Sequence, residues 1–316
     1  MIDFFSSLYS AIQSRNSLLD KIRFYSLCRL VVRNIANLIL PAYLRLSEKP
    51  RINISSGTVE KKPLLIASLT TFPARIDKVW IVIESIMRQT HKPDRVMLWL
   101  SREQFPDGCI LPESLRDLEK RGLEVVFCDG DMRSHKKYYY VLKNFPEAYL
   151  FTFDDDIIYR STLISELMDL HNEFPGAICC DRTLKINKTD GDILPYKTWG
   201  EIKTGTEPSR ELFHTSGAGT LYFPGALHPA VLDSEVFLKY CMYADDIWLN
   251  CMAQLNQTPI VKVKRYITWL PVINKIKISL MKINVDEGQN DVQLNNVREY
   301  FKKEMGKDPF DWVSDV

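Results

Sequence analysis

Three consecutive carboxylates, Asp154, Asp155 and Asp156, have the clearest chemical potential in this sequence. They directly follow the apolar run AYLFTF (148–153) and are followed by two isoleucines. Adjacent carboxylates repel one another, which raises their proton affinities unless a cation neutralises them. Magnesium and manganese prefer oxygen ligands and often take only one or two protein carboxylates, while phosphate oxygens complete the shell. The triplet therefore predicts a divalent-cation site, with an exposed acidic turn as the alternative.

A basic cluster precedes the triplet along the chain. It consists of Arg133, His135, Lys136 and Lys137, together with Ser134. The cluster stands just before an expected helix, so the free N–H groups at the helix start would add to the charge of the side chains. This arrangement predicts an anion site. A solvated basic turn, with His135 in a structural hydrogen bond, is the alternative.

A second acidic pair, Asp245 and Asp246, lies within YADDIWLN and opens an expected helix over 244–255. Carboxylates are common at helix N-termini simply because they cap free N–H groups and interact favourably with the helix dipole. The pair therefore has a structural as well as a functional interpretation.

Alternating strands and helices must position these groups. Four apolar runs are long enough for buried strands: 64–69, 95–101, 123–129 and 148–153. Helical spacing over 79–89 and 136–145 separates some of them. This rhythm predicts an α/β fold with a doubly wound, mainly parallel sheet. Such sheets bind ligands beyond the carboxyl ends of their strands, which is where the triplet is expected.

The stretch from residue 64 to Asp156 resembles the nucleotide-binding half of GT-A glycosyltransferases of the family-2 type. The phrase VWIVIESIMRQTHKPDRVMLWLS (79–101) is similar to their first helix and second strand, and DDD stands where that superfamily carries its DxD motif. The resemblance covers about a third of the chain. It implies a GT-A-like fold and a metal-dependent, inverting transfer from a nucleotide sugar to an acceptor hydroxyl, as in the assembly of capsule, lipopolysaccharide and other bacterial surface polysaccharides. Ser101 departs from the pattern, because an acidic residue usually follows the second strand.

The resemblance also assigns roles to individual side chains. Asp154 and Asp156 would ligate the Mn²⁺ or Mg²⁺ ion that bridges the donor diphosphate, and Asp154 and Asp155 would lie towards the nucleotide. Asp246 would be the general base, with Asp245 as the alternate; an ordinary carboxylate suffices, since the hydroxyl loses its proton late. The other donor contacts would come from the basic cluster, acting on the diphosphate, and from Thr70, Phe72 and Arg75 in the loop after the first strand, unless that loop is a plain turn.

Two later segments could complete the site. HTSGAGTLYFPGALHP (214–229) contains Gly217, Gly219 and Tyr222, and with Trp199 it predicts a wall for the donor sugar and acceptor. A glycine-rich core strand and turn is the alternative. NVDEGQNDVQLNN (284–296) is expected to form a polar loop that closes over the donor, or a capped surface turn, with Asn290, Asp291 and Gln293 on it.

Apolar residues recur at helical spacing over 7–46 with arginines interleaved, which predicts one or two amphipathic helices. These helices would pack on the domain or lie on a membrane surface. The most apolar part, 35–44, is interrupted by Pro41 and is expected to be too short to cross a bilayer. A later basic stretch suits either anionic lipid or a strand pair with a solvated face: Lys262, Lys264, Arg265, Lys275 and Lys277. A membrane contact would bring the enzyme to a lipid-linked acceptor.

Composition excludes some classes of function. The 316 residues carry a net charge of +1, which gives no global attraction to nucleic acid, so we expect no nucleic-acid partner. Seven cysteines without CxxC spacing indicate neither a disulfide framework nor a zinc site, and a secretory signal is absent, so a cytoplasmic location is expected. We divide the chain into a helical extension and linker (1–62), a nucleotide-sugar-binding half (63–160) and an acceptor-binding part of the same domain (161–316).

Two other functions compete with sugar transfer. A sugar-1-phosphate nucleotidyltransferase would need the same sheet and metal carboxylates, but usually carries a GxGTRL-like phosphate loop that does not follow the first strand here. A non-catalytic carbohydrate-binding or membrane-associated protein would bind neither metal nor nucleotide.

Overall fold

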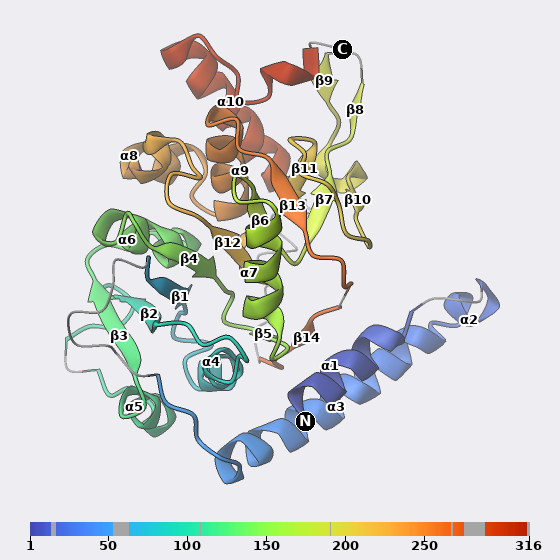
Figure 1. Ribbon diagram of the computed structural model, residues 1–316, viewed down its shortest axis with the longest axis vertical. Coiled ribbons are helices and arrows are strands. Elements are labelled where there is room, and N and C mark those ends of the chain that lie inside the picture. Colours follow the sequence, from blue (N-terminus) through green and yellow to red (C-terminus); the bar gives the residue numbers. More distant parts are fainter. Residues whose placement is uncertain are drawn as a thin grey trace.

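A seven-stranded sheet forms the centre of the protein in a computed structural model (Figure 1). The structure describes residues 1–13, 17–52, 63–107, 109–189, 191–266, 268–274 and 288–314. The strand order is β13-β6-β12-β4-β1-β2-β3. The strands are β1 (Leu65–Thr70), β2 (Arg95–Ser101), β3 (Leu123–Cys128), β4 (Tyr149–Thr152), β6 (Ile178–Cys180), β12 (Thr220–Tyr222) and β13 (Ile260–Lys262).

Strand direction confirms the expected mainly parallel sheet. β12 runs antiparallel to both of its neighbours, β4 and β6, whereas the other pairings in this sheet are parallel. The four strands predicted from apolar runs agree with the structure to within one residue at each end. A run that is apolar on both faces cannot expose either face to solvent, so its limits are well defined by the sequence.

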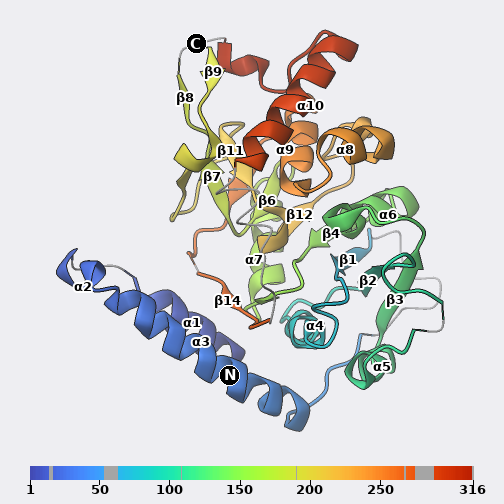
Figure 2. The ribbon, with the colours of Figure 1, turned by 180° about the vertical axis from the view of Figure 1, so that it is seen from behind.

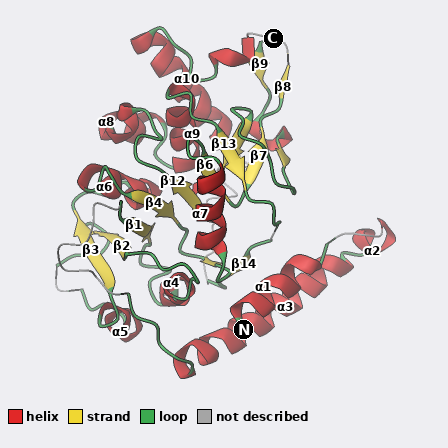
Figure 3. Ribbon diagram, in the orientation of Figure 1, coloured by secondary structure: helices red, strands yellow, loops and turns green. Residues whose placement is uncertain are grey.

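Helices cover both faces of the sheet, which confirms the doubly wound arrangement (Figures 1 and 3). Within β1, Leu65, Ala67 and Leu69 enter one hydrophobic core and Ile66 enters the other, because successive side chains of a strand point to opposite faces. The first core is built with α3 (Phe24–Leu46), α4 (Val79–Met87), α5 (Glu113–Glu119) and α7 (Leu163–Glu173). The second is built with α6 (Lys136–Asn144), α8 (Ser234–Tyr240), α9 (Asp245–Leu255) and α10 (Gln289–Met305).

Several short strands lie outside the main sheet. β5 (Ile157–Ile158) pairs with β14 (Leu270–Pro271), and β8 (Lys188–Thr189) pairs with β9 (Asp192–Ile193). A three-stranded sheet contains β7 (Thr183–Lys185), β10 (Gly200–Glu201) and β11 (Leu212–His214).

The predicted N-terminal helices are α1 (Ile2–Ala11), α2 (Ser17–Lys21) and α3. Figure 2 shows α1 and α3 side by side along one edge of the molecule. The expectation that Pro41 interrupts the apolar stretch is wrong, because α3 continues through it for 23 residues. Proline removes only one intrahelical hydrogen bond, and the helix has several turns on the N-terminal side of that position and one beyond it.

Two other expectations are corrected by the structure. Asn290, Asp291 and Gln293 lie in the first turns of α10, so the predicted polar loop is wrong. Gly288 is the N-cap residue of the helix, and apolar side chains farther along it are buried in the second core. Lys262 is buried in β13, where its ammonium donates to the carbonyl of Val263 at 2.9 Å, so it is not available to lipid. Lys264 and Arg265 are exposed, whereas Lys275 and Lys277 lie outside the described residues.

Candidate active site

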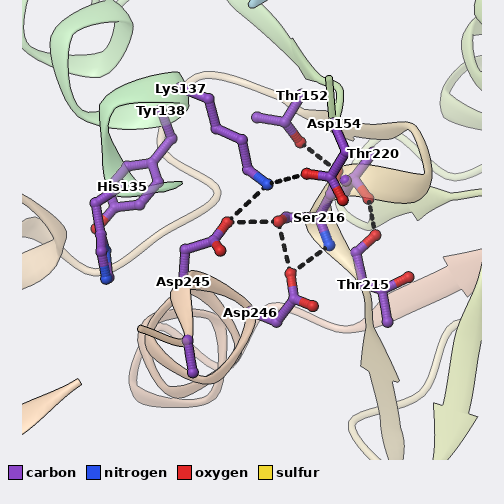
Figure 4. Close-up of polar contacts among 12 residues, drawn as sticks. His135, Lys137, Tyr138, Thr152, Asp154, Thr215, Ser216, Thr220, Asp245 and Asp246 are labelled. Carbon is purple, nitrogen blue, oxygen red and sulfur yellow. Dashed lines mark hydrogen bonds and ion pairs between the residues drawn. The ribbon is translucent and has the colours of Figure 1, made fainter. Parts of the chain in front are cut away.

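The carboxylates predicted from sequence meet at one edge of the sheet. β1 and β4 are parallel neighbours, so the loop after β1 and the triplet after β4 emerge side by side. The 3₁₀ turn η3 (Ser216–Ala218), which leads into β12, and the N-terminus of α9 approach the same edge (Figure 4). Segments separated by more than 150 residues of chain therefore form a single polar site.

Arg75 is the main partner of the buried side of the triplet. Its guanidinium forms a close ion pair with Asp155 and lies 2.9 Å from Oδ2 of Asp156. Thr71 Oγ1 also donates to Asp155 Oδ2 at 2.5 Å. The loop after β1 thus holds two of the three carboxylates, which is a more specific role than the predicted contact with a nucleoside.

Lys137 joins the triplet to the second acidic pair (Figure 4). Its buried ammonium lies 2.8 Å from Asp154 Oδ1 and 2.9 Å from Asp245 Oδ2. Ser216 continues the chain of contacts: its backbone N–H donates to Asp246 Oδ1 at 2.7 Å, and its hydroxyl lies 2.7 Å from Asp245 and 2.6 Å from Asp246. Four elements, α6, β4, η3 and α9, are therefore held together by one polar network.

The two acidic residues of the pair have different proton affinities. Burial raises the pKa of Asp246 to about 6, and the adjacent charge of Asp245 adds to the rise, although Lys137 acts in the opposite direction. For Asp245, burial also acts to raise the pKa, but Lys137, His135 and a hydrogen bond from Ser134 together hold that pKa well below its usual value. Environments that separate two neighbouring pKa values are typical of acid–base sites.

The triplet also carries excess negative charge. Burial, partly offset by Arg75, raises the pKa of Asp156 to about 6, and the charges of Asp154 and Asp155 raise it further. Burial likewise raises the pKa of Asp155. The protein's own cations therefore do not fully neutralise these carboxylates.

The triplet could bind a divalent cation only together with ligands that the protein does not supply. Within the described part of the chain, no group of three or more acidic, histidine or cysteine side chains is arranged to hold a metal. The ion pairs engage Oδ1 of Asp154 and Oδ2 of Asp156, so the second oxygen of each carboxylate remains for another ligand. Two carboxylate oxygens suit Mg²⁺ or Mn²⁺ when phosphate or water oxygens supply the rest of the shell.

Glycines at the η3 turn allow this close packing. A Cβ on Gly217 would lie 1.9 Å from Cγ of Asp154, and the Gly217 carbonyl accepts from the N–H of Asp154 at 3.2 Å. Gly219 has a φ of 102°, and a Cβ there would lie 2.6 Å from Leu163. The two glycines therefore bring η3 against the triplet, whereas the sequence had suggested a wall for the sugar.

Most of the basic cluster does not contact the acidic triplet. His135 is fully buried, with Nδ1 2.7 Å from the Tyr138 hydroxyl and Nε2 2.8 Å from the Cys241 carbonyl, so neither ring nitrogen is left for a ligand. Lys136 and Arg133 both form ion pairs with Asp131, at 2.5 and 2.7 Å. Among the basic side chains of the cluster, Lys137 is the one that reaches the triplet.

Two residues that were expected to contact the sugar or acceptor are internal. Trp199 is buried in the second core and donates from Nε1 to the Leu194 carbonyl at 2.8 Å. Tyr222 is buried in the same core, next to His214. Both were expected to line a wall for the sugar, but an aromatic ring that carries a polar atom is equally suited to a core with internal hydrogen bonds.

Two residues of the loop after β1 that were predicted to bind the donor contact other side chains or backbone of the protein. The Thr70 hydroxyl donates to the Trp99 carbonyl at 2.8 Å. Phe72 is half-buried, with the Arg75 guanidinium 5.3 Å from its ring centre.

Two residues of the network were not singled out from sequence. Ser216 contacts both acidic residues of the pair, and the Tyr159 hydroxyl lies 2.8 Å from the N–H of Asp154 and 2.5 Å from the Gly217 carbonyl. The position of Tyr159, three residues after the triplet, gave a local signal; Ser216 lay inside the glycine-rich segment but had no spacing that distinguished it.

Comparisons with known proteins find only distant structural matches. No described family matches the sequence, and a search of curated proteins finds no match. S. aureus TarS 1-349, solved in complex with UDP-GlcNAc, is 14% identical with a TM-score of 0.45 over 76% of this chain and 74% of that one. A UTP-bound UGPase from Acinetobacter baumannii is 10% identical (TM-score 0.38; 76% and 94%), and a 4-diphosphocytidyl-2C-methyl-D-erythritol synthase is 11% identical (TM-score 0.43; 74% and 99%). Similarity at this level does not bear on the activity or the substrate.

Proposed function

We propose that this protein is a glycosyltransferase that moves a sugar from a nucleotide-sugar donor to an acceptor hydroxyl, with inversion at the anomeric carbon. The observation that carries the proposal is the acidic pair on α9, whose pKa values are separated, linked by Lys137 to the triplet at the end of β4. A proton acceptor and the carboxylates proposed to bind a metal thus face the same edge of the sheet.

Asp246 is the proposed general base. Its pKa of about 6 leaves it ionised at neutral pH and still basic enough to accept a proton from the attacking hydroxyl. Ser216 and the backbone N–H of the same residue hold one oxygen, Oδ1, which leaves Oδ2 for the acceptor. Asp245 is the proposed positioning residue, because it is the counterion of buried Lys137 and its charge raises the proton affinity of its neighbour.

Asp154 and Asp156 are the proposed metal ligands. A Mn²⁺ or Mg²⁺ ion held there would neutralise charge on the leaving nucleoside diphosphate. Arg75 keeps Asp156 in place, and Lys137 does the same for Asp154, so the two carboxylates are oriented before any ligand arrives.

The proposed setting is the cytoplasm, on a glycan or lipid-linked acceptor used in surface-polysaccharide synthesis. All seven cysteines are free, and five are buried, which is consistent with a reducing compartment.

A panel of nucleotide sugars tests the proposal by metal-dependent release of nucleoside diphosphate. The wild-type protein should release it from at least one donor, and Asp246→Asn should be slower by about 10²–10⁴-fold, the usual contribution of a general base. Asp129→Asn, at an exposed carboxylate outside the network, is the matched control and should keep full activity. Full turnover by Asp246→Asn would refute its role, and release of pyrophosphate from a nucleoside triphosphate and a sugar 1-phosphate would identify a nucleotidyltransferase instead. A protein that binds neither manganese nor a nucleoside diphosphate would be non-catalytic.

A further inference from the structure

The outward side of α3 is an apolar stripe that no described part of the protein covers. Large hydrophobic side chains recur there at intervals of three and four residues as far as Leu38, the spacing that places residues on one helix face, and Leu46 follows eight residues later. They are Phe24, Leu27, Val31, Ile35, Leu38 and Leu46, with Leu38 78% exposed and Leu27 57% exposed. The stripe runs the length of a 23-residue helix, about 34 Å.

The neighbouring N-terminal helices extend this surface. Phe4 and Leu8 are exposed along α1 and Met1 just before it, and Leu18 and Ile22 are exposed in and after α2. Thirteen of the seventeen large hydrophobic side chains exposed in the described residues lie before residue 47. Soluble surfaces rarely concentrate apolar side chains in this way unless the patch binds something.

Charge indicates what the surface binds. The first 52 residues contain eight basic and three acidic side chains, although the whole chain has a net charge of only +1. α3 itself has no acidic residue, and Lys21, Arg23 and Arg45 are exposed near its two ends. A second copy packed on the same surface by two-fold symmetry would bring basic side chains together, whereas an anionic lipid surface offers opposite charge.

The opposite side of α3 fixes the helix along the body of the protein. Ala36, Leu40 and Leu44 are fully buried, and the Asn37 side chain bonds the Pro271 carbonyl and the Ile273 N–H at 2.9 and 2.8 Å. α3 is long and apolar enough to cross a bilayer, with 17% of its most apolar window buried. Its contacts with the domain favour a helix that lies in the membrane plane.

The same contacts connect the stripe to the candidate site. Asn37 holds the residues on either side of Val272, and the N–H of Val272 donates to the Asp156 carbonyl at 2.8 Å. The segment 271–273, at the end of β14, therefore links α3 to the triplet.

We propose that the outward faces of α1 and α3 form a docking platform that inserts into the interfacial region of an anionic bilayer. The platform would hold the candidate site beside the membrane. Resting on the function proposed above, this position assigns an acceptor that is anchored in the bilayer by a lipid.

Flotation of the full-length protein with vesicles tests the platform. Wild-type protein should float at low salt with vesicles of phosphatidylcholine and phosphatidylglycerol, and less with phosphatidylcholine alone. The double variant Leu27→Glu, Leu38→Glu should bind the anionic vesicles at least about 100-fold more weakly, because each leucine contributes roughly tenfold to partition. Ile110→Glu replaces a side chain that is 85% exposed outside the platform, so this control should float like wild type. Lys21→Gln with Arg23→Gln should weaken binding to the anionic vesicles and leave the residual binding to phosphatidylcholine unchanged.

Several results would overturn the platform. Wild-type protein that stays in the soluble fraction with anionic vesicles at low salt contradicts it, as does equal flotation of wild type and the double-leucine variant. A wild-type dimer that the same variant converts to a monomer, without flotation, would make the surface an interface between copies. Assays with a water-soluble acceptor separate this proposal from the function: a protein that floats but releases no nucleoside diphosphate refutes sugar transfer and leaves the platform standing.

Discussion

Replacing Gly217 with alanine should displace Asp154 and damage both stability and activity. The new Cβ would lie 1.9 Å from Asp154 Cγ and Oδ2, far inside van der Waals contact. Gly217 is not among the described glycines with positive φ, so the backbone itself accepts alanine. The carboxylate must therefore rotate away and lose its 2.8 Å contact with Lys137.

The size of the effect follows from these contacts. Overpacking costs about 1–3 kcal/mol, and a hydrogen bond between charged groups contributes about 1.5–3 kcal/mol when it is fully buried. Asp154 is 44% exposed and its flexible end can relax, so we expect a loss of about 1–3 kcal/mol and a fall in Tm of roughly 2–9 °C. Nucleoside diphosphate release should fall further, because the displaced carboxylate is a proposed metal ligand.

A matched control and a double variant make the test specific. Gly176→Ala adds a Cβ with no atom within 4 Å and no positive φ, so it should unfold and react like wild type. Asp154→Ala removes the atoms that clash, so Gly217→Ala should cost almost nothing in that background. Thermal unfolding and turnover of the four proteins measure the coupling. The reasoning fails if Gly217→Ala matches Gly176→Ala, or if the penalty persists without Asp154.

Other predictions address the charges of the site. Nucleoside diphosphate release should rise with pH through about 6, because Asp246 accepts a proton only when ionised; a profile that is flat from about pH 5 to about pH 8 would contradict its role as base. Lys137→Met should lower the free energy of unfolding by about 3–5 kcal/mol in chemical denaturation, because it leaves a buried carboxylate without its counterion. In the folded variant the rising limb should move to higher pH, since Lys137 lowers the pKa of Asp246; an unmoved limb would count against the network. Asp156→Asn should stabilise the metal-free protein above pH 6, where the ionised carboxylate is disfavoured, and should abolish the dependence of nucleotide binding on manganese in calorimetry; unchanged manganese dependence would remove it from the metal site.

The sequence was sufficient to predict four of the seven strands of the main sheet and the places where the acidic groups emerge from it. A strand buried on both faces must be apolar throughout, so β1, β2, β3 and β4 were visible as continuous runs. Parallel strands bring their carboxyl ends to one edge, and the triplet followed directly on such a run. Local patterns of this kind depend on neighbours in the chain, and a single sequence contains them.

Tertiary structure decided which groups pair with which. Arg75 and Lys137 were both singled out for a ligand, yet they neutralise carboxylates of the protein, and His135 turned into the core. α10 was hidden because its polar first turns resemble a loop until the residues that bury its apolar side are known. The N-terminal pattern likewise predicted amphipathic helices but not which side faces outward. Residue spacing encodes the direction of a side chain relative to its own helix or strand, and only the packing of distant segments determines what lies opposite.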